Sequence, residues 1–269
     1  MAGRVQSLRV AAEQPRSDWD RTVDEWPVSA PISVLRAYSD AVNSALIRRW
    51  LPSLMGARVL KTDLFDEAVA GGLVPELRAA GASILGVDVS VATVAAARAR
   101  YPDLAVEVGD VRRLRFPDET FDLVVSNSTL DHFGSTAELE GALDELHRVV
   151  RCGGTLLVTL DNGANPIVAL RNALPERVLR RLGLTHYFLG ETCGPRRLAT
   201  LLRAAGFDVE RTSALMHFPR IVARLLAALV GPRPRLLRLL LAAERLEQTP
   251  LRYATGQFVA AKAVKPMQP

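Results

Sequence analysis

The chain contains little cysteine and little histidine. Among its 269 residues are two cysteines, Cys152 and Cys193, and four histidines. These residues do not recur at the short spacings that hold a metal ion. No apolar secretion signal opens the sequence, and so few cysteines favour a reducing compartment. We therefore expect a cytoplasmic protein with no metal site and no disulfide framework.

Long apolar runs are also absent, and so is a patterned basic surface. No run reaches the about 18 to 20 residues that a membrane-spanning helix needs, so we expect no such helix. The net charge is +5, and the excess is mainly Arg. Aromatic residues do not alternate with these Arg residues, which we interpret as solvated helix faces. A nucleic-acid partner is therefore not expected.

Three short apolar runs, which alternate with helical patterns, end on polar residues. One run ends at Asp88, the next at Asp110, and the third leads into Ser126-Asn127-Ser128. This alternation predicts an α/β fold, with a mostly parallel sheet and helices on both faces. Ligands of such sheets bind beyond the carboxyl ends of the strands. Asp88 can accept hydrogen bonds from a ribose diol and Asp110 from the amino group of a base. The pair predicts a nucleoside-containing cofactor.

The same stretch resembles the class I S-adenosylmethionine-dependent methyltransferases. Four segments carry the resemblance in the family's order, namely residues 86–90, 109–117, 121–126 and 145–154. The resemblance covers roughly residues 51–265. It implies a Rossmann-like, doubly wound sheet of seven strands, whose final two strands form a hairpin. It also implies S-adenosylmethionine as the cofactor.

The resemblance assigns cofactor contacts to particular residues. Asp88, with Val89 beside it, would bind the ribose hydroxyls, and Asp110 with Val111 would lie at the adenine. The turn Asn127-Ser128 stands where the family holds the methionine part of the cofactor. The alternative for this turn is that Asn and Ser simply suit the end of a strand.

Glycine is missing from the loop where the family normally has it. The first strand usually leads into a loop of the form acid-x-Gly-x-Gly-x-Gly, whose glycines let the backbone approach the ligand. Here residues 61–72 carry Asp63 and Glu67, and glycines come late, at Gly71 and Gly72. An acidic loop disfavours phosphate and suits a sulfonium with an amino-acid tail. We expect Asp63, Glu67 and Gly71 at the cofactor, with an acid paired to its ammonium. Alternatively, the acids only favour the positive end of the next helix dipole.

Methyl transfer from a sulfonium is an in-line displacement, and a hydroxyl acceptor must also lose its proton to a base. His132 follows the fourth predicted strand, in a turn that lies beside the transferred methyl in the resembled family. We therefore predict His132 as the catalytic base, with Asp131 next to it as a residue that orients the ring. The alternative is a hydrogen-bonded histidine at the start of a helix. His147, within a helix, is expected to be structural.

Two insertions, residues 161–194 and 217–249, leave the predicted sheet where the family places substrate caps. Caps on a rigid scaffold commonly carry specificity. The second insertion is apolar and rich in Arg, and we interpret it as helices that pack on the sheet. Contact with a membrane surface is the less favoured alternative. The residues expected at the substrate are Asp161, Asn162, His186, Tyr187 and His217.

The N-terminal segment, residues 1–52, is expected to be a lid, and residues 53–265 to be the methyltransferase domain. Pro31 is followed by apolar residues at helical spacing, which predict a lid helix. Trp19 and Trp26 precede this helix, and we interpret both as packing residues rather than cofactor contacts.

These observations predict S-adenosylmethionine-dependent methyl transfer to a small molecule. Oxygen is marginally favoured as the acceptor atom because His132 is available, and the apolar insertions favour a rather apolar acceptor. The alternative is a cofactor-binding or scaffold protein of the same fold without methyltransferase activity, which the glycine-poor loop supports. The sequence makes no prediction of the oligomeric state.

Overall fold

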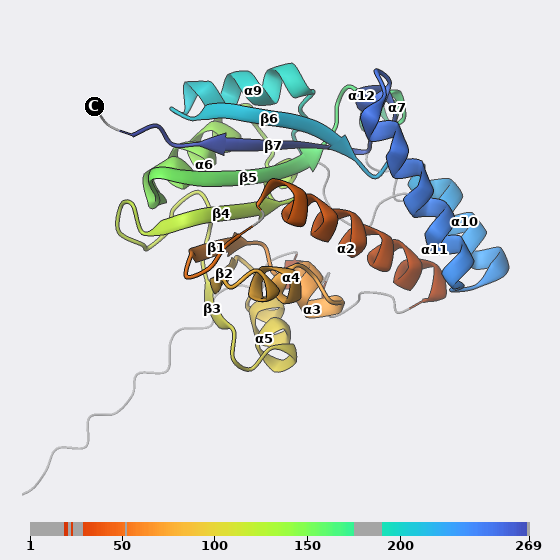
Figure 1. Ribbon diagram of the computed structural model, residues 1–269, viewed down its shortest axis with the longest axis horizontal. Coiled ribbons are helices and arrows are strands. Elements are labelled where there is room, and N and C mark those ends of the chain that lie inside the picture. The colour runs from red at the N-terminus through yellow and green to blue at the C-terminus, as the bar shows by residue number, and fades with distance from the viewer. Residues whose placement is uncertain (1–18, 21–22, 24–28, 52, 175–189, 268–269) are drawn as a thin grey trace, which may run out of the picture.

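The computed structural model describes residues 19–20, 23, 29–51, 53–174 and 190–267. These residues form a seven-stranded sheet of order β3-β2-β1-β4-β5-β7-β6 with helices on both faces (Figure 1). Strands β1 to β5 run parallel, and β7 lies antiparallel between β5 and β6. The predicted Rossmann-like sheet and its final antiparallel pair are confirmed. The strands are β1 Arg58–Thr62, β2 Ser83–Asp88, β3 Ala105–Val108, β4 Phe121–Asn127, β5 Val150–Asp161, β6 Asp208–Leu215 and β7 Phe258–Val264.

The helices alternate with the parallel strands and then cluster in the two insertions. Up to the end of β5 they are α2 Ala30–Trp50, α3 Phe65–Val69, α4 Val74–Ala79, α5 Val91–Arg100, the 3₁₀ turn η1 Leu130–His132 and α6 Thr136–Val149. After β5 come α7 Pro166–Ala173, α9 Pro195–Ala204, α10 Arg220–Val230, α11 Pro234–Ala242, the 3₁₀ turn η2 Ala243–Gln248 and α12 Arg252–Thr255.

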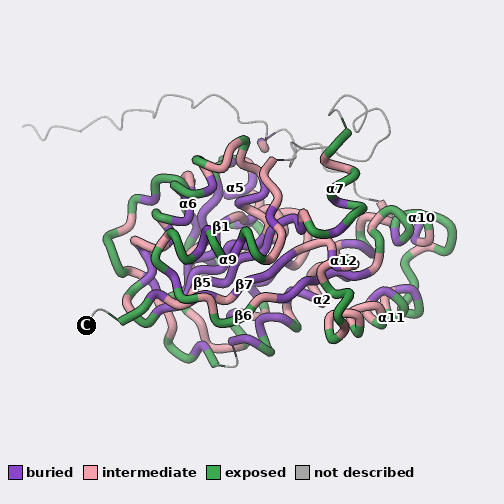
Figure 2. Tube along the Cα trace, turned by 90° about the horizontal axis from the view of Figure 1, so that it is seen from above, coloured by how far each residue is buried: buried purple, intermediate pink, exposed green. Residues whose placement is uncertain are grey.

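Each face of the sheet has its own core, because side chains along a strand alternate between the two faces. On one face, Leu60 and Val124 pack with apolar side chains of α6 and α9. On the other face, Val59 and Leu123 pack with side chains of α2 and α4, and α5 covers Val106 of β3. Figure 2 shows the buried strands between more exposed helices. This two-sided cover leaves the carboxyl ends of the strands as the place for a site.

The N-terminal segment is tied to the first turn of α5. Ser90 Oγ accepts the N–H of Thr93 at 3.0 Å, which caps this helix. The buried carboxylate of Asp20 accepts the Ser90 hydroxyl at 2.6 Å and the N–H of Ala92 at 3.0 Å. These bonds hold the residue before Asp20, which is Trp19, beside the end of β2.

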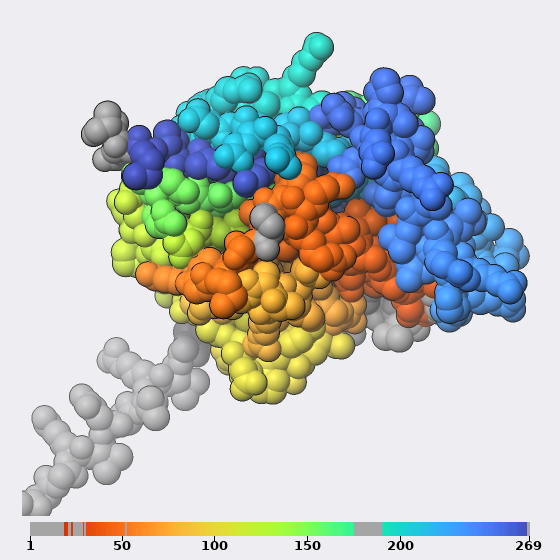
Figure 3. Space-filling view, viewed as in Figure 1, coloured from red at the N-terminus to blue at the C-terminus, as the bar shows by residue number. Residues whose placement is uncertain are grey.

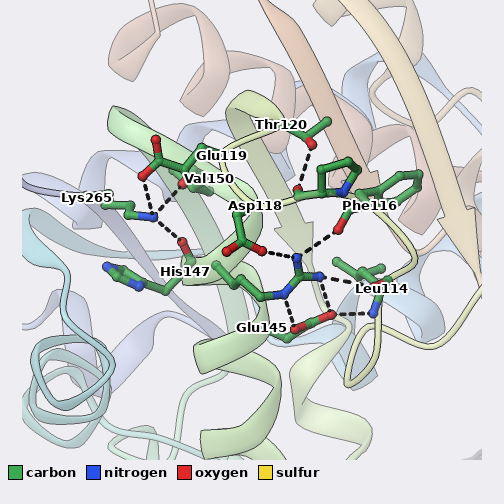
Figure 4. A network of polar contacts seen from close by, with 11 residues as sticks. Leu114, Phe116, Asp118, Glu119, Thr120, Glu145, His147, Val150 and Lys265 are labelled. Carbon is green, nitrogen blue, oxygen red and sulfur yellow. Dashed lines mark hydrogen bonds and ion pairs between the residues drawn. The ribbon is translucent and has the colours of Figure 1, made fainter.

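Arg148 of α6 fastens the loop between β3 and β4 (Figure 4). Its guanidinium donates to the carbonyl oxygens of Leu114 at 3.1 Å and Phe116 at 2.8 Å. It also donates to the carboxylates of Asp118 at 2.7 Å and Glu145 at 2.8 Å. Glu145 in turn accepts the N–H of Leu114 at 2.6 Å. The chain that leaves the end of β3 is therefore held in place from α6.

The second insertion packs mainly on α2, whereas the sequence predicted packing on the sheet. Helices α10 and α11 lie against α2 and project at one end of the molecule (Figure 1). The hydroxyl of Tyr38 donates to Glu244, and Arg49 donates to Glu247 through two bonds of 2.7 and 2.8 Å. The α2 helix therefore lies between the sheet and this insertion.

Candidate active site

Two pockets meet at the carboxyl ends of the strands, where the sheet order reverses between β1 and β4. Ligands of doubly wound sheets bind at such a reversal. The larger pocket has a cavity of about 270 Å³ and lies at the ends of β1, β2 and β3, where Val89 and Val111 are among its lining residues. The smaller pocket, of about 80 Å³, is bounded by β4, α2 and Arg220 of α10. The two share Trp19 and His132 as walls.

Asp88 lies at the tip of β2 and lines the larger pocket. Its Oδ1 accepts the N–H of Ser90 at 2.8 Å, and its Oδ2 accepts the N–H of Leu64 at 2.8 Å. Burial and the neighbouring Asp63 raise the pKa of Asp88 to about 7, against these two hydrogen bonds. Each carboxylate oxygen has a second lone pair, so an ionised Asp88 can still accept from a diol.

Asp63 lies in the wall shared by the two pockets. Its backbone has φ +75°, a left-handed conformation that Asp tolerates better than most residues. Its Oδ1 accepts the N–H of Phe65 at 2.7 Å. Burial raises the pKa of Asp63, although the Lys61 ammonium opposes that effect. Asp63 therefore adopts a left-handed backbone conformation, and this turn places its carboxyl group where both pockets meet.

A buried ion pair shapes the loop after β1. Lys61 Nζ lies 2.9 Å from Glu67 Oε2, and both side chains are almost completely inaccessible to solvent. Lys61 also donates to the carbonyl oxygen of Asp63, and Glu67 Oε1 accepts the N–H of Leu73 at 2.8 Å. Burial disfavours the charge of Lys61, but Glu67 and Asp63 outweigh it and raise its pKa. The structure thus corrects the expectation that Glu67 pairs with a cofactor ammonium, because its partner is Lys61.

Gly71 also lies outside both pockets, contrary to expectation. Its carbonyl oxygen accepts the hydroxyl of Tyr101 at 2.6 Å. The neighbouring Gly72 is the glycine that the loop requires: its φ is +63°, and a Cβ there would lie 2.3 Å from Glu67 Oε1. The late glycines therefore allow the backbone to close over the ion pair.

Asp110 lines the larger pocket, but its carboxylate is already bound by Arg112. Arg112 Nη2 lies 2.6 Å from Asp110 Oδ2, and Nε lies 3.0 Å from both oxygens. Burial opposes ionisation, but these bonds outweigh it and lower the pKa of Asp110. Arg112 also pairs with Glu138 and lies over the Phe133 ring at 5.4 Å. Any adenine amino group at Asp110 would share the carboxylate with Arg112.

The turn after β4 lines the smaller pocket through Asn127 and Ser128. Asn127 Oδ1 accepts the hydroxyl of Thr159 at 2.7 Å. Ser128, at φ +53°, donates to Asp131 Oδ2 at 2.9 Å. Burial raises the pKa of Asp131 to about 6, and its Oδ1 accepts no hydrogen bond within the described part of the chain. This Oδ1 lies 3.9 Å from His132 Nε2.

His132 forms part of the wall of both pockets, and Trp19 covers it. The rings of Trp19 and His132 meet edge to face with their centroids 4.6 Å apart, and Trp19 also approaches Phe65 at 6.5 Å. Trp19 packs as the sequence predicted, and it also lines both pockets, which the sequence did not predict. Trp26 lies outside the described residues. Among the histidines, His132 alone of those that the structure describes contributes to either pocket.

The described residues that were expected at the substrate, Asp161, Asn162 and His217, make contacts within the fold and line neither pocket. Asp161 pairs with Arg171, and its N–H donates to Asp131 at 3.2 Å. Asn162 is buried and uses its side chain on backbone groups, with its Nδ2 donating to the carbonyl oxygens of Tyr253 and Gly256 at 2.8 Å.

The ring nitrogens of His217 are bonded as well. Its Nδ1 lies 2.8 Å from Thr255 Oγ1, and its Nε2 lies 3.0 Å from the carbonyl oxygen of Ala214. His217 is buried and lines neither pocket. His186 and Tyr187 lie outside the described residues.

Sequence reasoning missed the rim of the larger pocket. Arg112 follows Asp110 by two residues and donates its N–H to the Asp110 carboxylate at 2.9 Å, a local turn that the spacing could have indicated. Phe133 and Glu138 complete the rim and carried no such signal. No group of three or more His, Cys, Asp or Glu side chains in the described ranges is arranged to hold a metal ion.

Comparison with known proteins supports a methyltransferase family. A family model described as a methyltransferase domain matches residues 68–158. A probable S-adenosylmethionine-dependent methyltransferase of Mycolicibacterium smegmatis is 31% identical over 134 residues, which are 50% of this chain and 47% of the relative. Residues 68–158 therefore match a methyltransferase domain, and this relative supports the resemblance of the chain to the class I S-adenosylmethionine-dependent methyltransferases. A demethylmenaquinone methyltransferase of Paenarthrobacter aurescens is 31% identical over 150 residues, 54% of this chain and 56% of the relative. The chain spans about half the length of these curated relatives.

Solved structures share the fold of this methyltransferase domain. A Thermotoga maritima S-adenosylmethionine-dependent methyltransferase, described as a possible histamine N-methyltransferase, has a TM-score of 0.62 and 18% identity, and the similarity covers 92% of this chain and 98% of that one. The [4+2]-cyclase SpnF has a TM-score of 0.57 and 21% identity, covering 84% of this chain and 80% of that one. The fold is therefore shared with at least one protein named for a different reaction.

S-adenosylmethionine is the cofactor of this family, and the larger pocket fits it. Asp88 offers carboxylate acceptors for a diol, and Asp110 offers them for an amino group. Asp63 places a carboxyl group at the junction with the smaller pocket, where a sulfonium or an ammonium would favour its charged form. The residues of this chain therefore suit the cofactor even though the glycine-rich loop is replaced.

Proposed function

We propose that this chain transfers the methyl group of S-adenosylmethionine to a small, largely apolar acceptor. The observation that carries the proposal is the junction of the two pockets. Asp88 and Asp110 line only the larger one, Asn127 and Ser128 line only the smaller one, and Asp63 and His132 line both. A cofactor in the larger pocket would present its reactive end to a molecule in the smaller one.

The residues of the chain divide the work of binding. Asp88 would accept from the ribose hydroxyls, Asp110 from the adenine amino group, and Asp63 would balance the positive charge of the methionine part. Bound there, S-adenosylmethionine supplies an electrophilic methyl group on a sulfonium. The hydroxyls of Thr62 and Thr129, which both line the larger pocket, form a hydrogen bond of 3.1 Å. This bond connects the end of β1 to the start of η1. A rigid pocket wall helps to hold the methyl donor and the acceptor in a reactive orientation, which supplies a large part of the rate acceleration.

Oxygen is the acceptor atom that we favour. His132 would take the proton of an acceptor hydroxyl while the oxygen–carbon bond forms and the carbon–sulfur bond breaks. The carboxylate of Asp131, 3.9 Å from His132 Nε2, would stabilise the imidazolium that results. Relatives named for demethylmenaquinone support an apolar acceptor of quinone type.

A second candidate is a protein that binds the cofactor without methylating an acceptor. The loop in which Lys61 and Glu67 form a buried pair favours it, because the glycines that usually surround the cofactor are absent. The shared fold of the cyclase SpnF supports it at the level of architecture only.

Calorimetry followed by turnover assays tests the two candidates. Titration with S-adenosylmethionine and with S-adenosylhomocysteine should show binding at one site, which Asp88→Ala weakens. Release of S-adenosylhomocysteine is then measured with apolar phenols, quinols and amines as acceptors. No binding at millimolar cofactor would contradict both candidates. Binding without turnover on any acceptor class would favour the second.

A further inference from the structure

Helix α10 is apolar on two opposite faces. Ala223 and Ala227 are buried on the face that contacts α2. On the outward face, Ile221, Leu225 and Leu229 follow one another at helical spacing and are 50%, 59% and 82% exposed. A helix that is apolar all round is typical of a buried environment, and a surface helix normally turns polar residues outward. The outward face of α10 therefore suits a partner that removes it from water.

This face lies on the projecting end of the molecule. We call the exposed side chains of Ile221, Val222, Leu225 and Leu229 the cap face. Figure 3 shows α10 and α11 as the blue region that extends furthest from the sheet on that side. Leu239 of α11 is exposed as well. Contiguous exposed apolar side chains mark interaction sites in soluble proteins more often than single ones do.

The sequence of the two cap helices carries charge of one sign only. Residues 211–243 contain no Asp or Glu. The first acids that follow, Glu244 and Glu247, are turned inward. Glu244 accepts the hydroxyl of Tyr38 and the N–H of His217, and Glu247 binds Arg49 and Ser213. The Arg residues of the two cap helices and the turn between them are Arg220, Arg224, Arg233, Arg235 and Arg238.

We propose that the cap face docks on the surface of a bilayer that contains anionic lipids. Helices that lie in a membrane interface combine an apolar face with Lys or Arg, which contact the lipid phosphates. The eleven residues of α10 span about 16 Å, too short to cross the hydrocarbon core. None of the helices among the described residues is long and apolar enough to do so either. The helix therefore lies along the surface.

A second copy of the chain is a poorer occupant than a lipid surface. Two copies that met through the cap helices would bring together basic segments, since residues 211–243 of each copy carry Arg residues and no acid. Like charges at an interface oppose association. Anionic phosphates supply the missing charge, and each Arg near such a surface contributes about 1 kcal/mol to binding, which is about fivefold in affinity.

Helix α10, which carries the cap face, also reaches the active site. Arg220 is the first residue of α10 and lines the smaller pocket, where we place the acceptor. If the proposed methyl transfer is correct, an apolar acceptor dissolved in the bilayer would reach this pocket beside the docked helix. The docking itself does not depend on the proposed reaction.

Vesicle flotation of the full chain tests the docking without cofactor or acceptor. The protein is mixed with vesicles of phosphatidylcholine alone, or of phosphatidylcholine with phosphatidylglycerol. We expect flotation with the anionic vesicles, little with the neutral ones, and a decrease at high salt. The double variant Leu225→Glu/Leu229→Glu should weaken binding at least tenfold. Arg235→Gln/Arg238→Gln should weaken binding to anionic vesicles by roughly fivefold for each Arg.

Met55→Glu is the matched control. Met55 is 80% exposed in the turn before β1, at the opposite end of the strands from the pockets, and this variant should bind vesicles like the wild type. Thermal melts verify that each variant is folded. The proposal is overturned if the wild type does not float with anionic vesicles, or if Leu225→Glu/Leu229→Glu binds as well as Met55→Glu. It is also overturned if the wild type is a dimer that this double variant dissociates and vesicle binding is absent. Failure of cofactor binding would leave these results unaffected, so the two proposals are tested separately.

Discussion

The ammonium of Lys61 lies 2.9 Å from the carboxylate of Glu67, and water reaches neither group. The resembled family has a glycine-rich loop at this place, which approaches its ligand through bare backbone. Here a charged pair holds the loop instead, because Lys61 also binds the carbonyl oxygen of Asp63 and Glu67 binds the N–H of Leu73. The position of Asp63 at the pocket junction therefore depends on a buried ion pair.

Removal of one member of this pair should be strongly destabilising. Lys61→Met would leave the Glu67 carboxylate buried without a counter-charge, which typically costs about 3 to 5 kcal/mol. The double variant Lys61→Met/Glu67→Leu should recover most of that loss, since apolar replacements of a buried pair are often nearly neutral. Urea denaturation at neutral pH measures both. Equal destabilisation by the single and double variants would show that the pair does not act as a unit.

Asp88 should control affinity for the cofactor. Asp88→Ala removes an acceptor for two ribose hydroxyls, and hydrogen bonds to a charged group contribute about 1.5 to 3 kcal/mol each. We expect S-adenosylmethionine to bind at least tenfold more weakly by calorimetry. Asp88→Asn should retain part of the affinity, because its carbonyl oxygen still accepts. Unchanged affinity in a folded Asp88→Ala variant would remove the main support for the cofactor assignment.

The same residue should make stability depend on pH. Its pKa is about 7 in the folded chain and near 3.8 when unfolded, so the folded state holds a proton that the unfolded state has released. The stabilisation is complete below about pH 4 and is lost as the pH rises through about 7. Compared with Asp88→Asn, the wild type should lose free energy of unfolding across that window. A parallel pH dependence in both proteins would contradict the raised pKa. Cofactor affinity should rise over the same range, since the ionised carboxylate is the better acceptor.

Asp110 should matter for affinity and little for folding. Its replacement by Ala removes one acceptor at the adenine, which should weaken cofactor binding by about 1 to 2 kcal/mol. Arg112 would lose its partner but keep Glu138 and the Phe133 ring, so the melting temperature should change little. Calorimetry on folded Asp110→Ala gives the answer. Wild-type affinity would mean that Arg112, which binds this carboxylate at 2.6 Å, keeps Asp110 out of ligand recognition.

Local signals in the sequence predicted the frame of the site well. The β2 strand ends at Asp88, as the apolar run in the sequence indicated. The acids at strand tips were found for the same reason, since parallel strands bring their carboxyl ends to one edge. Asp88 and Asp110 do line one pocket.

Contacts between distant segments could not be predicted in this way. Trp19 reaches the pocket because Asp20 caps α5 some seventy residues later, and no spacing encodes that bond. Glu67 was expected at the cofactor because the sequence does not show that Lys61 is its buried partner. Asn162 and His217 are polar residues of the cap insertions, but their side chains form hydrogen bonds with backbone or hydroxyl groups within the fold.

His132 should be needed for turnover and not for cofactor binding. If His132 is the general base, its replacement by Ala should slow methyl transfer to an oxygen acceptor by about 10² to 10⁴-fold.

The ring of His132 also packs edge-on against Trp19, so a slower rate in His132→Ala has a second explanation, a disturbed pocket wall. His132→Phe keeps an aromatic ring against Trp19 but cannot take a proton, so it should be as slow as His132→Ala. His147→Ala is the matched control, since that ring packs on Phe207 at 4.9 Å and lines neither pocket. Single-turnover rates measured across about pH 6 to 9 separate the roles. A normal rate in His132→Phe would show that the residue only packs, and a normal rate in both variants would assign proton removal to another group or to the acceptor itself.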